Sequence, residues 1–400
     1  MKPRVMIVAN AAWNIANFRM GIARELLAAG YEVVAVAPPD AYVQHLKDAG
    51  LRFEPMPMNR KGMNPIEDLL LLKRLYQLIA RERPVAYLGY TIKPNVYGGI
   101  ACRWLGVASI HNVAGLGFAF ARNGLLARVA RTLYRWAFKR ARLVFFQNEE
   151  DRRMMIERNV VRADITDRLP GSGVDTLHFA EVPTPEAGDS TFRAVLCARL
   201  LREKGIAEYA EAARLLKAEG RVVDFQLLGP FDHDNPSAIS RSEVDAWVAQ
   251  GLLHHAGSTR DVREHFALAD VVVLPSFYRE GLPRTLLEAA SMGRPIVTTD
   301  SVGCREAVED GVTGFLCKPN DARDLADKIA CVMDMSRAQR RAFGVAARER
   351  IVRDFDERIV IRKYAAAVTA FAQESPPKRK APVPVLSDQH LPGARHDEIQ

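Results

Sequence analysis

Two glutamates spaced eight residues apart are the first candidates for chemistry in this sequence. Glu280 and Glu288 lie in the stretch SFYREGLPRTLLE, which follows the apolar run 271–275. We expect the run to form a buried strand and the next helix to extend from about residue 282 to about 292. Glu280 would then lie on the loop before the helix, and Glu288 nearly two turns inside it.

The loop that begins at Glu280 could bind an anion. Gly281 permits a positive φ or a close approach of another backbone, and the free N–H groups of a helix N-terminus attract phosphate. Two flanking carboxylates suit a ligand whose phosphate lies between hydroxyl-rich groups, such as a sugar nucleotide. A surface turn with solvated glutamates would give the same spacing, so the pattern alone leaves both interpretations open.

A second candidate site lies in the sequence RLLREKG at 199–205. Arg199 and Lys204 follow the apolar run 192–198, which we expect to be a strand. Ligands of open α/β sheets bind at the carboxyl ends of the strands, and two cations there could neutralise a diphosphate. Ordinary surface charges on a loop are the alternative.

Two further residues lie at expected element ends in the first half of the chain. His111 lies near the end of the expected strand 109–113, just before a glycine-spaced loop, and could be a ligand contact or a hydrogen-bonded structural residue. Lys93 precedes a helix and is a candidate contact for an acceptor phosphate, with a plain surface charge as the alternative.

Apolar runs alternate with amphipathic segments, an order that predicts parallel α/β domains. We expect strands at 5–9, 31–37, 86–90, 109–113, 143–147, 192–198, 222–229, 253–256, 271–275 and 295–299. We expect helices at 18–29, 65–82, 207–219, 262–269 and 321–335, and loops at 10–17 and 310–315. The first strand unit lacks the GxGxxG dinucleotide fingerprint.

The length of 400 residues predicts two domains. We place an N-terminal domain at 1–180, a linker rich in Pro, Gly and acid at 181–190, and a C-terminal domain at 191–355. A last amphipathic helix follows at 356–373, and the Pro-rich, basic segment 374–400 has the composition of a disordered tail.

Composition narrows the compartment and the partners. The formal net charge of +8 favours a polyanionic or phosphorylated partner. Five cysteines without a CxxC pair indicate neither a disulfide framework nor a zinc site, and they suit a reduced, cytoplasmic compartment. No apolar run approaches the ~20 residues that span a bilayer, and we interpret the apolar N-terminus as a strand rather than a signal peptide.

Residues 122–142 have the pattern of a basic amphipathic helix. One face groups Leu125, Leu126, Val129, Leu133 and Trp136, and the basic residues are Arg122, Arg128, Arg131, Arg135, Lys139, Arg140 and Arg142. Such a helix is typical of an interfacial membrane segment. A core helix with a solvated basic back is the alternative, and nucleic acid is less favoured because no nucleic-acid-binding module is present.

Four motifs in order make the chain resemble a retaining glycosyltransferase of family 4, over about residues 1–373. They are GSGVD at 171–175, ARLLREKG at 198–205, EGLPRTLLEAASMGRPIV at 280–297 and DGVTGFL at 310–316. The resemblance implies the GT-B fold, an α/β fold in which two Rossmann-like domains face each other across a cleft. It also implies that the C-terminal helix crosses back to the N-terminal domain.

The resemblance assigns a role to each site residue. Glu288 should hydrogen-bond the ribose of the nucleotide, and Glu280 should contact the donor sugar near the reacting centre. The backbone at Gly281 and Leu282 should meet sugar or phosphate. Arg199 and Lys204 should bind the diphosphate and stabilise it as it leaves, and His111 should meet the donor sugar.

The family implies retention through front-face attack without a metal ion or other cofactor. Two DxD sequences, Asp232–Asp234 and Asp354–Asp356, have the letters of a metal motif, but matches by chance are expected in a chain with this many acids. We therefore expect no metal.

Two N-terminal sequences, TIKPNVYG and HNVAGLGFAF, narrow the resemblance. They are similar to bacterial enzymes that transfer an N-acetylhexosamine from a UDP-sugar to a polyprenyl-diphosphate-linked sugar, for O-antigen, capsule or glycoprotein glycans. Residues 122–142, with Arg128, Arg131 and Arg135, would then dock on the anionic inner face of the cytoplasmic membrane. The alternatives are a soluble transferase with a small acceptor and a non-catalytic binding module.

Overall fold

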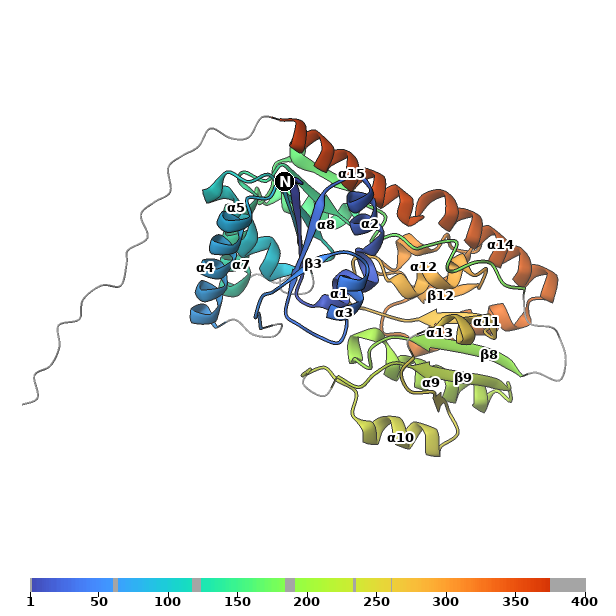
Figure 1. Ribbon diagram of the computed structural model, residues 1–400. Coiled ribbons are helices and arrows are strands. Elements are labelled where there is room, and N and C mark those ends of the chain that lie inside the picture. The colour runs from blue at the N-terminus through green and yellow to red at the C-terminus, as the bar shows by residue number, and fades with distance from the viewer. Residues whose placement is uncertain are drawn as a thin grey trace, which may run out of the picture.

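The computed structural model describes residues 2–59, 64–116, 124–183, 191–232, 235–259 and 261–374 (Figure 1). Several predictions concern residues outside these ranges: the tail from 375 onward, most of the linker, Arg122, and the last two residues of the DxD sequence at 232–234. The side chain of Leu126 is also not described.

The N-terminal half forms a seven-stranded parallel sheet. The strand order is β3-β2-β1-β4-β5-β6-β7, and all the pairings are parallel. The strands are β1 (Arg4–Val8), β2 (Glu32–Ala37), β3 (Arg52–Pro55), β4 (Ala86–Tyr90), β5 (Ser109–Val113), β6 (Leu143–Phe146) and β7 (Thr166–Arg168). The central strands β4 and β5 are buried along their whole length, as expected for a sheet covered on both faces.

Helices cover both faces of this sheet (Figure 1). They are α1 (Ala12–Phe18), α2 (Met20–Ala28), α3 (Val43–Asp48), α4 (Pro65–Glu82), α5 (Gly99–Leu105), α7 (Leu125–Phe138), α8 (Glu149–Glu157) and short turns at Ala163–Ile165 (η2) and Pro94–Gly98 (η1). The start of α4 is set locally, because Asn64 caps the helix and Pro65 occupies its first position. The turn η1 is a single π-helical turn.

The C-terminal half forms a six-stranded sheet in the order β10-β9-β8-β11-β12-β13, again parallel. Its strands are β8 (Phe192–Cys197), β9 (Val223–Leu228), β10 (His254–His255), β11 (Val271–Leu274), β12 (Ile296–Thr299) and β13 (Gly314–Cys317). Its helices are α9 (Ile206–Ala218), α10 (Arg241–Ala249), α11 (Arg263–Ala267), α12 (Arg284–Ser291), α13 (Ala322–Asp334), α14 (Arg337–Asp354) and the turns η3 (Arg202–Lys204) and η4 (Arg305–Ala307).

The last helix, α15 (Glu357–Gln373), returns to the N-terminal domain and packs against α2 (Figure 1). Val360, Tyr364 and Val368 are buried in the N-terminal core. Asn112 on β5 donates a hydrogen bond of 3.3 Å to the Tyr364 hydroxyl. The predicted crossing helix and the predicted pair of parallel α/β domains are therefore confirmed.

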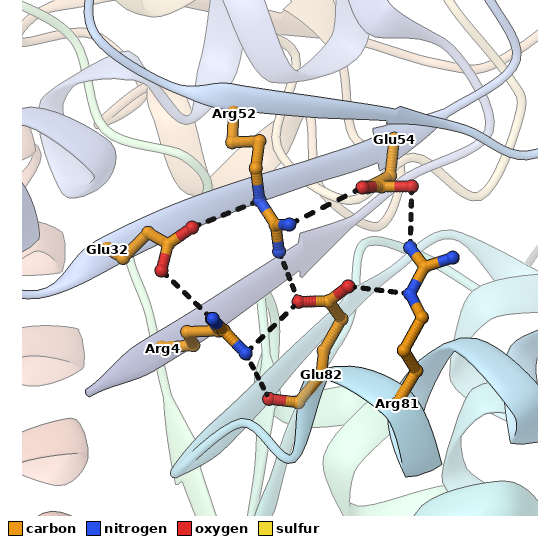
Figure 2. A network of polar contacts seen from close by, with 6 residues as sticks. All are labelled: Arg4, Glu32, Arg52, Glu54, Arg81 and Glu82. Carbon is orange, nitrogen blue, oxygen red and sulfur yellow. Dashed lines mark hydrogen bonds and ion pairs between the residues drawn. The ribbon is translucent and has the colours of Figure 1, made fainter. Parts of the chain in front are cut away.

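An ionic network ties together the amino ends of β1, β2 and β3 and the end of α4 (Figure 2). Glu82 is only 4% exposed and accepts hydrogen bonds from Arg52 and Arg81, while Arg4 and Arg52 both pair with Glu32, at 2.9 and 3.1 Å. Because this network lies at the amino edge of the sheet, it stabilises the domain from the side opposite the carboxyl ends of the strands.

Three local predictions were wrong. The loop expected at 10–17 contains helix α1, and a separate helix, α2, follows it. Strand β13 begins at Gly314, inside the segment expected to be a loop at 310–315. Helix α12 begins at Arg284 rather than near 282, because Pro283 is the extended N-cap residue.

Candidate active site

The two domains meet where loops from the carboxyl ends of both sheets touch. The loop after β5 contacts the loop between β11 and α12: a Cβ on Gly115 would lie 2.9 Å from the backbone nitrogen of Gly281. A Cβ on Gly281 would collide with the Ala114 carbonyl and the Gln147 amide. The close backbone approach permitted by Gly281 is therefore observed, and it is an approach of the other domain.

Glu280 and Lys204 form an ion pair within this meeting point. Their side chains are 14% and 16% exposed, and Ser276 Oγ lies 2.9 Å from Glu280 Oε1. Glu280 lies on the loop before α12, as predicted, and Lys204 ends η3, just before α9. The structure thus brings together two residues that are 76 positions apart in the sequence.

Arg199 follows β8 and is 58% exposed. Its guanidinium lies 3.1 Å from the Asp232 carboxylate. Each of the two cations assigned to a diphosphate is therefore paired with a carboxylate in this structure, Arg199 with Asp232 and Lys204 with Glu280. Entry of a diphosphate would replace these partners with phosphate oxygens.

Glu288 lies in the second turn of α12, with a side chain 15% exposed. Burial raises the pKa of Glu288 to about 7, although the Arg284 guanidinium 2.7 Å away acts to lower it and Asp261 raises it further. Arg284 also donates a hydrogen bond to the Asn17 carbonyl of the N-terminal domain. The carboxylate predicted to bind ribose is thus linked to the opposite domain.

Leu282 contributes its backbone to the loop and its side chain to the core. The side chain is 8% exposed and packs in the cluster below α12. Gly171, at φ +64°, lies directly against it. This packing fixes the loop, and only backbone groups of Leu282 remain for the predicted contact with sugar or phosphate.

A buried carboxylate, Asp151, connects the loops of the two domains. It is fully buried, accepts a hydrogen bond from the Leu116 backbone at 3.2 Å and from the Asn148 amide at 3.0 Å, and pairs with Arg279 at 2.9 Å. Arg279 immediately precedes Glu280. Sequence reasoning missed this contact, because the local capping pair of Asn148 and Asp151 at the start of α8 does not indicate a partner in the other domain.

The prediction that His111 contacts the donor sugar is not supported. The imidazole is fully buried in β5, and its nitrogens lie 3.3 Å from the Asn95 amide oxygen and 3.0 Å from the Ser109 hydroxyl. Its ring packs 5.1 Å from that of Phe138. Burial lowers the pKa of His111 to about 3, so its imidazole is neutral at physiological pH.

A pocket of about 240 Å³, here called the sheet-edge pocket, opens beside the domain contact. Its lining residues come from the ends of β1, β4 and β5, from the segment after β3, from η1 and from α7: Asn10, Met58, Asn59, Thr91, Ile92, Lys93, Asn95, Asn112, Val113, Ala114, Gly115 and Tyr134. Thr91 has φ +67°, a strained value for a β-branched residue. Its buried hydroxyl has no hydrogen-bond partner among the described residues. Such a hydroxyl favours a polar ligand here.

Lys93 lies at the rim of this pocket, directly before η1. Its ammonium group pairs with Asp68 of α4 at 2.7 Å, and both side chains are largely buried, at 15% and 12% exposure. Asp68 therefore fixes the position of Lys93, the residue predicted to contact an acceptor phosphate. The sequence did not reveal this acidic partner.

Helix α7 lies inside the predicted amphipathic helix 122–142, and three residues of the predicted apolar face are exposed rather than packed. Ala127, Tyr134, Ala137 and Phe138 form its buried side. Leu125, Val129 and Trp136 are 79%, 48% and 54% exposed, which removes the core-helix explanation for these three residues.

The basic residues of α7 differ in their surroundings. Arg128 is exposed and Arg131 is half-buried. Arg135 donates hydrogen bonds of 2.8 and 3.1 Å to the carbonyls of Asn159 and Arg158, so it caps the end of α8. The prediction that Arg135 serves a membrane surface stays a prediction, and the structure adds that two backbone carbonyls already engage its guanidinium.

Within the described ranges, no group of three or more His, Cys, Asp or Glu side chains could hold a metal ion. Asp354 pairs with Arg353, and Asp356 caps α15 while pairing with Arg358, so this DxD sequence is structural. The helices described in the structure include none that is both long and apolar enough to cross a bilayer.

Known proteins similar to this chain share both halves of this arrangement. Residues 15–170 match the family model of the glycosyl transferase 4-like domain, and residues 191–335 match that of glycosyl transferases group 1. Among solved structures, a glycosyltransferase from Rickettsia africae has a TM-score of 0.76 at 18% identity, over 94% of this chain and 100% of that one. HepE of Anabaena in complex with UDP and glucose has a TM-score of 0.75 at 19% identity, over 92% and 100%.

Two bacterial relatives have named activities. The N,N'-diacetylbacillosaminyl-diphospho-undecaprenol alpha-1,3-N-acetylgalactosaminyltransferase of Campylobacter jejuni is 28% identical, over 90% of this chain and 97% of its own. The UDP-Gal:alpha-D-GlcNAc-diphosphoundecaprenol alpha-1,3-galactosyltransferase of Escherichia coli is 26% identical, over 68% and 73%. With two matched family models and two facing parallel-sheet domains, this chain belongs to the GT-B glycosyltransferases, joining a glycosyl transferase 4-like domain to a group 1 domain.

Proposed function

We propose that this enzyme moves an N-acetylhexosamine, with retention of configuration, from a UDP-sugar to a saccharide linked to polyprenyl diphosphate. The Glu280–Lys204 pair beside Glu288 is the observation on which the proposal rests. Glu280 lies on the loop before α12, Glu288 lies inside α12, and Lys204 of η3 pairs with Glu280. We assign Glu280 to the donor sugar, Glu288 to the ribose and Lys204 to the diphosphate. The Campylobacter relative supports the choice of sugar and acceptor class by its name.

The chemistry follows from where charge develops. Cleavage of the bond between the sugar and the diphosphate leaves negative charge on the β-phosphate, and Arg199 and Lys204 would stabilise that charge as it forms. Glu280 would hold the donor sugar beside Lys204. The leaving phosphate would take the proton of the attacking hydroxyl on the same face of the sugar, so the configuration is retained. No step uses a metal ion.

The acceptor would enter from the N-terminal domain. The sheet-edge pocket reaches Gly115, which touches Gly281, so a saccharide in the pocket lies next to the donor loop. The unpartnered hydroxyl of Thr91 would bind this saccharide.

We further propose that the enzyme acts as a peripheral protein at the inner face of the bacterial cytoplasmic membrane. The exposed Leu125, Val129 and Trp136 would enter the interface, and Arg128 and Arg131 would face anionic headgroups. Each basic residue near the surface contributes about 1 kcal/mol. Assembly of O-antigen, capsule or glycoprotein glycans is the setting that this acceptor suggests.

The test is a donor screen with purified protein. UDP-GalNAc, UDP-GlcNAc, UDP-glucose and GDP-mannose are each offered with a polyprenyl-diphosphate-linked sugar, with and without EDTA. We expect the fastest transfer from a UDP-N-acetylhexosamine, an unchanged rate in EDTA, and an axial product linkage by NMR. Glu280→Gln should lower turnover on the order of a hundredfold.

Two results would decide against the proposal. Faster transfer from GDP-mannose would reject the donor, and an inverted product would reject the mechanism. Equal transfer to a small acceptor without diphosphate or lipid would favour a soluble transferase. In that case the protein should also fail to float with anionic vesicles, and Arg128→Glu should change nothing.

A further inference from the structure

Exposed apolar side chains gather on the first two turns of α4. Ile66, Leu69 and Leu70 are 71%, 67% and 44% exposed, and their spacing places them on neighbouring positions of one helix surface. Ile92, on the loop before η1, is 63% exposed. Helix α4 and helix α7 both pack against η1, and all lie on the same flank of the N-terminal domain (Figure 1). Apolar clusters of this kind mark binding surfaces.

A second pocket adjoins this cluster at Leu70. It measures about 190 Å³, and we call it the α4 pocket. Its apolar wall consists of Pro57, Met58, Leu70 and Leu71. Leu70 therefore has two roles, because it lines the pocket and also contributes to the exposed cluster above it.

The α4 pocket adjoins the sheet-edge pocket. Met58, Asn59 and Lys93 line both, so Lys93 stands where one leads into the other. Asp68 holds the Lys93 ammonium at 2.7 Å, and Arg74 supplies a second cation to the α4 pocket. The carboxylate of Glu67 is engaged by the amides of Asn59 and Asn64, at 3.4 and 3.3 Å.

The order along this path is apolar, cationic and then polar. An exposed apolar surface leads to the apolar wall of the α4 pocket, then to Lys93, then to a pocket with an unpartnered hydroxyl at Thr91, and finally to the Gly115–Gly281 contact beside Glu280. An amphiphile with a hydrocarbon chain, a phosphate and a saccharide has its parts in that same order.

We propose that the α4 pocket binds the first isoprene units of the acceptor's polyprenyl chain. The diphosphate then lies at Lys93 and the saccharide occupies the sheet-edge pocket. The exposed residues Ile66, Leu69 and Ile92 cover the next part of the chain where it leaves for the bilayer. The inference rests on the proposed acceptor class, and it adds where the lipid portion is recognised.

The experiment uses soluble acceptors in the absence of vesicles, so membrane docking makes no contribution. The same saccharide diphosphate is offered with a methyl group or with a ten-carbon, two-isoprene chain. We expect the two-isoprene acceptor to have a KM at least tenfold lower for the native enzyme, with a similar kcat. Leu70→Gln should abolish that difference and leave the KM of the methyl acceptor unchanged.

Leu268→Gln is the matched control, because Leu268 is 56% exposed and lies in the other domain, after α11. It should keep the full chain-length effect. If the native enzyme prefers the two-isoprene acceptor and Leu70→Gln preserves that preference, the α4 pocket is not the chain site. Equal KM values for both acceptors in the native enzyme would also overturn the proposal and would assign the exposed residues to membrane lipid instead. If no diphosphate acceptor is used at all, the proposed function itself fails, and that result differs from the other two.

Discussion

The guanidinium of Arg279 lies 2.9 Å from the carboxylate of Asp151, and these two residues belong to different domains. Arg279 precedes Glu280 in the chain, whereas Asp151 holds the backbone of Leu116 near the acceptor side of the contact. The position of the loop bearing Glu280 therefore depends on the N-terminal domain. Nucleotide binding, which the resemblance assigns to the C-terminal domain, should depend less on this ion pair, because neither Arg279 nor Asp151 is assigned to the nucleotide.

Asp151→Asn should consequently impair turnover more than nucleotide binding. The amide keeps the size of the side chain but loses the charge that engages Arg279. We expect kcat to fall about tenfold or more, because small misplacement of a reacting group is costly. The dissociation constant of UDP, measured by calorimetry, should stay within about twofold, since the interaction that is lost does not contact the nucleotide.

Glu150→Gln is the control for this prediction. Glu150 is the preceding residue on α8 and also pairs across the domains, with Arg305 at 2.9 Å and more distantly with Arg279 at 3.9 Å, but its side chain is 46% exposed. Exposed pairs contribute little, so kcat should be nearly native. Equal losses of kcat in both variants would mean that breaking any interdomain ion pair lowers turnover, which would contradict a specific role for Asp151.

The contact between Gly115 and Gly281 gives a second prediction. Gly115→Ala adds a Cβ at a position with φ +113°, 2.9 Å from the Gly281 nitrogen, so the two loops must separate. Transfer to the acceptor should fall by about tenfold or more, from the same positioning argument, while UDP binding persists. The measurement is a comparison of kcat with UDP affinity.

Gly124→Ala provides the matched substitution. A Cβ at Gly124 meets nothing within 4 Å, and φ is −157°. Its turnover should equal that of the native enzyme. Native turnover in Gly115→Ala would show that the domains do not need this close contact for catalysis.

Local signals explain how much of the fold was predictable. The limits of α4 and β5 were predicted to the residue, because Pro65 marks the first helical position of α4 and the glycines Gly106 and Gly115 bracket the short strand β5. Helix α14 was missed: only Gly344, Ala347 and Ile351 of its 18 residues are buried, so its sequence has little apolar periodicity. Strand β13 was missed because its existence depends on pairing with β12.

Some residues of the candidate site could likewise be predicted from local sequence, and others could not. Glu280 and Glu288 lie in one continuous motif and could be singled out from spacing, and their assigned roles stay predictions. The Arg279–Asp151 pair joins residues 128 positions apart, which no local pattern encodes. His111 lies at the predicted strand position, yet its burial against Phe138 depends on packing between β5 and α7.

The network around Glu82 gives a prediction about stability (Figure 2). Glu82→Gln should lower the free energy of unfolding by about 1–3 kcal/mol at neutral pH, because a nearly buried acceptor of charged hydrogen bonds is lost. Burial acts to raise the pKa of Glu82, but the hydrogen bonds from Arg52 and Arg81 prevail and hold it below its usual value. The folded pKa is thus depressed, so the stabilisation is present at neutral pH and disappears as the pH falls into the acid range.

Denaturant titrations of both proteins at several pH values measure this difference. Glu211→Gln is the control, since Glu211 forms an exposed pair with Arg214 one turn away on α9. That variant should unfold as the native protein does. A difference between native and Glu82→Gln that stayed constant from neutral to acid pH would assign the effect to packing rather than to charge.

The raised pKa of Glu288 predicts that donor binding depends on pH. Burial holds that pKa at about 7, with Arg284 lowering it and Asp261 raising it. Only the ionised carboxylate accepts hydrogen bonds from both ribose hydroxyls, so the donor KM should fall as the pH rises from 6 to 8. A pKa near 7 leaves roughly one glutamate in ten ionised at pH 6 and nine in ten at pH 8, which gives about a tenfold change.

Two variants separate the parts of this pH effect. In Glu288→Gln the donor KM should be high throughout and nearly independent of pH, because the titrating group is gone. In Arg284→Gln the fall of the donor KM with pH should occur at higher pH, since the cation 2.7 Å from the Glu288 carboxylate no longer favours the ionised form. Steady-state kinetics at pH 6, 7 and 8 measure all three proteins. A native KM that is flat across this range, or an Arg284→Gln curve that moves to lower pH, would show that Glu288 does not bind the donor as its ionised form.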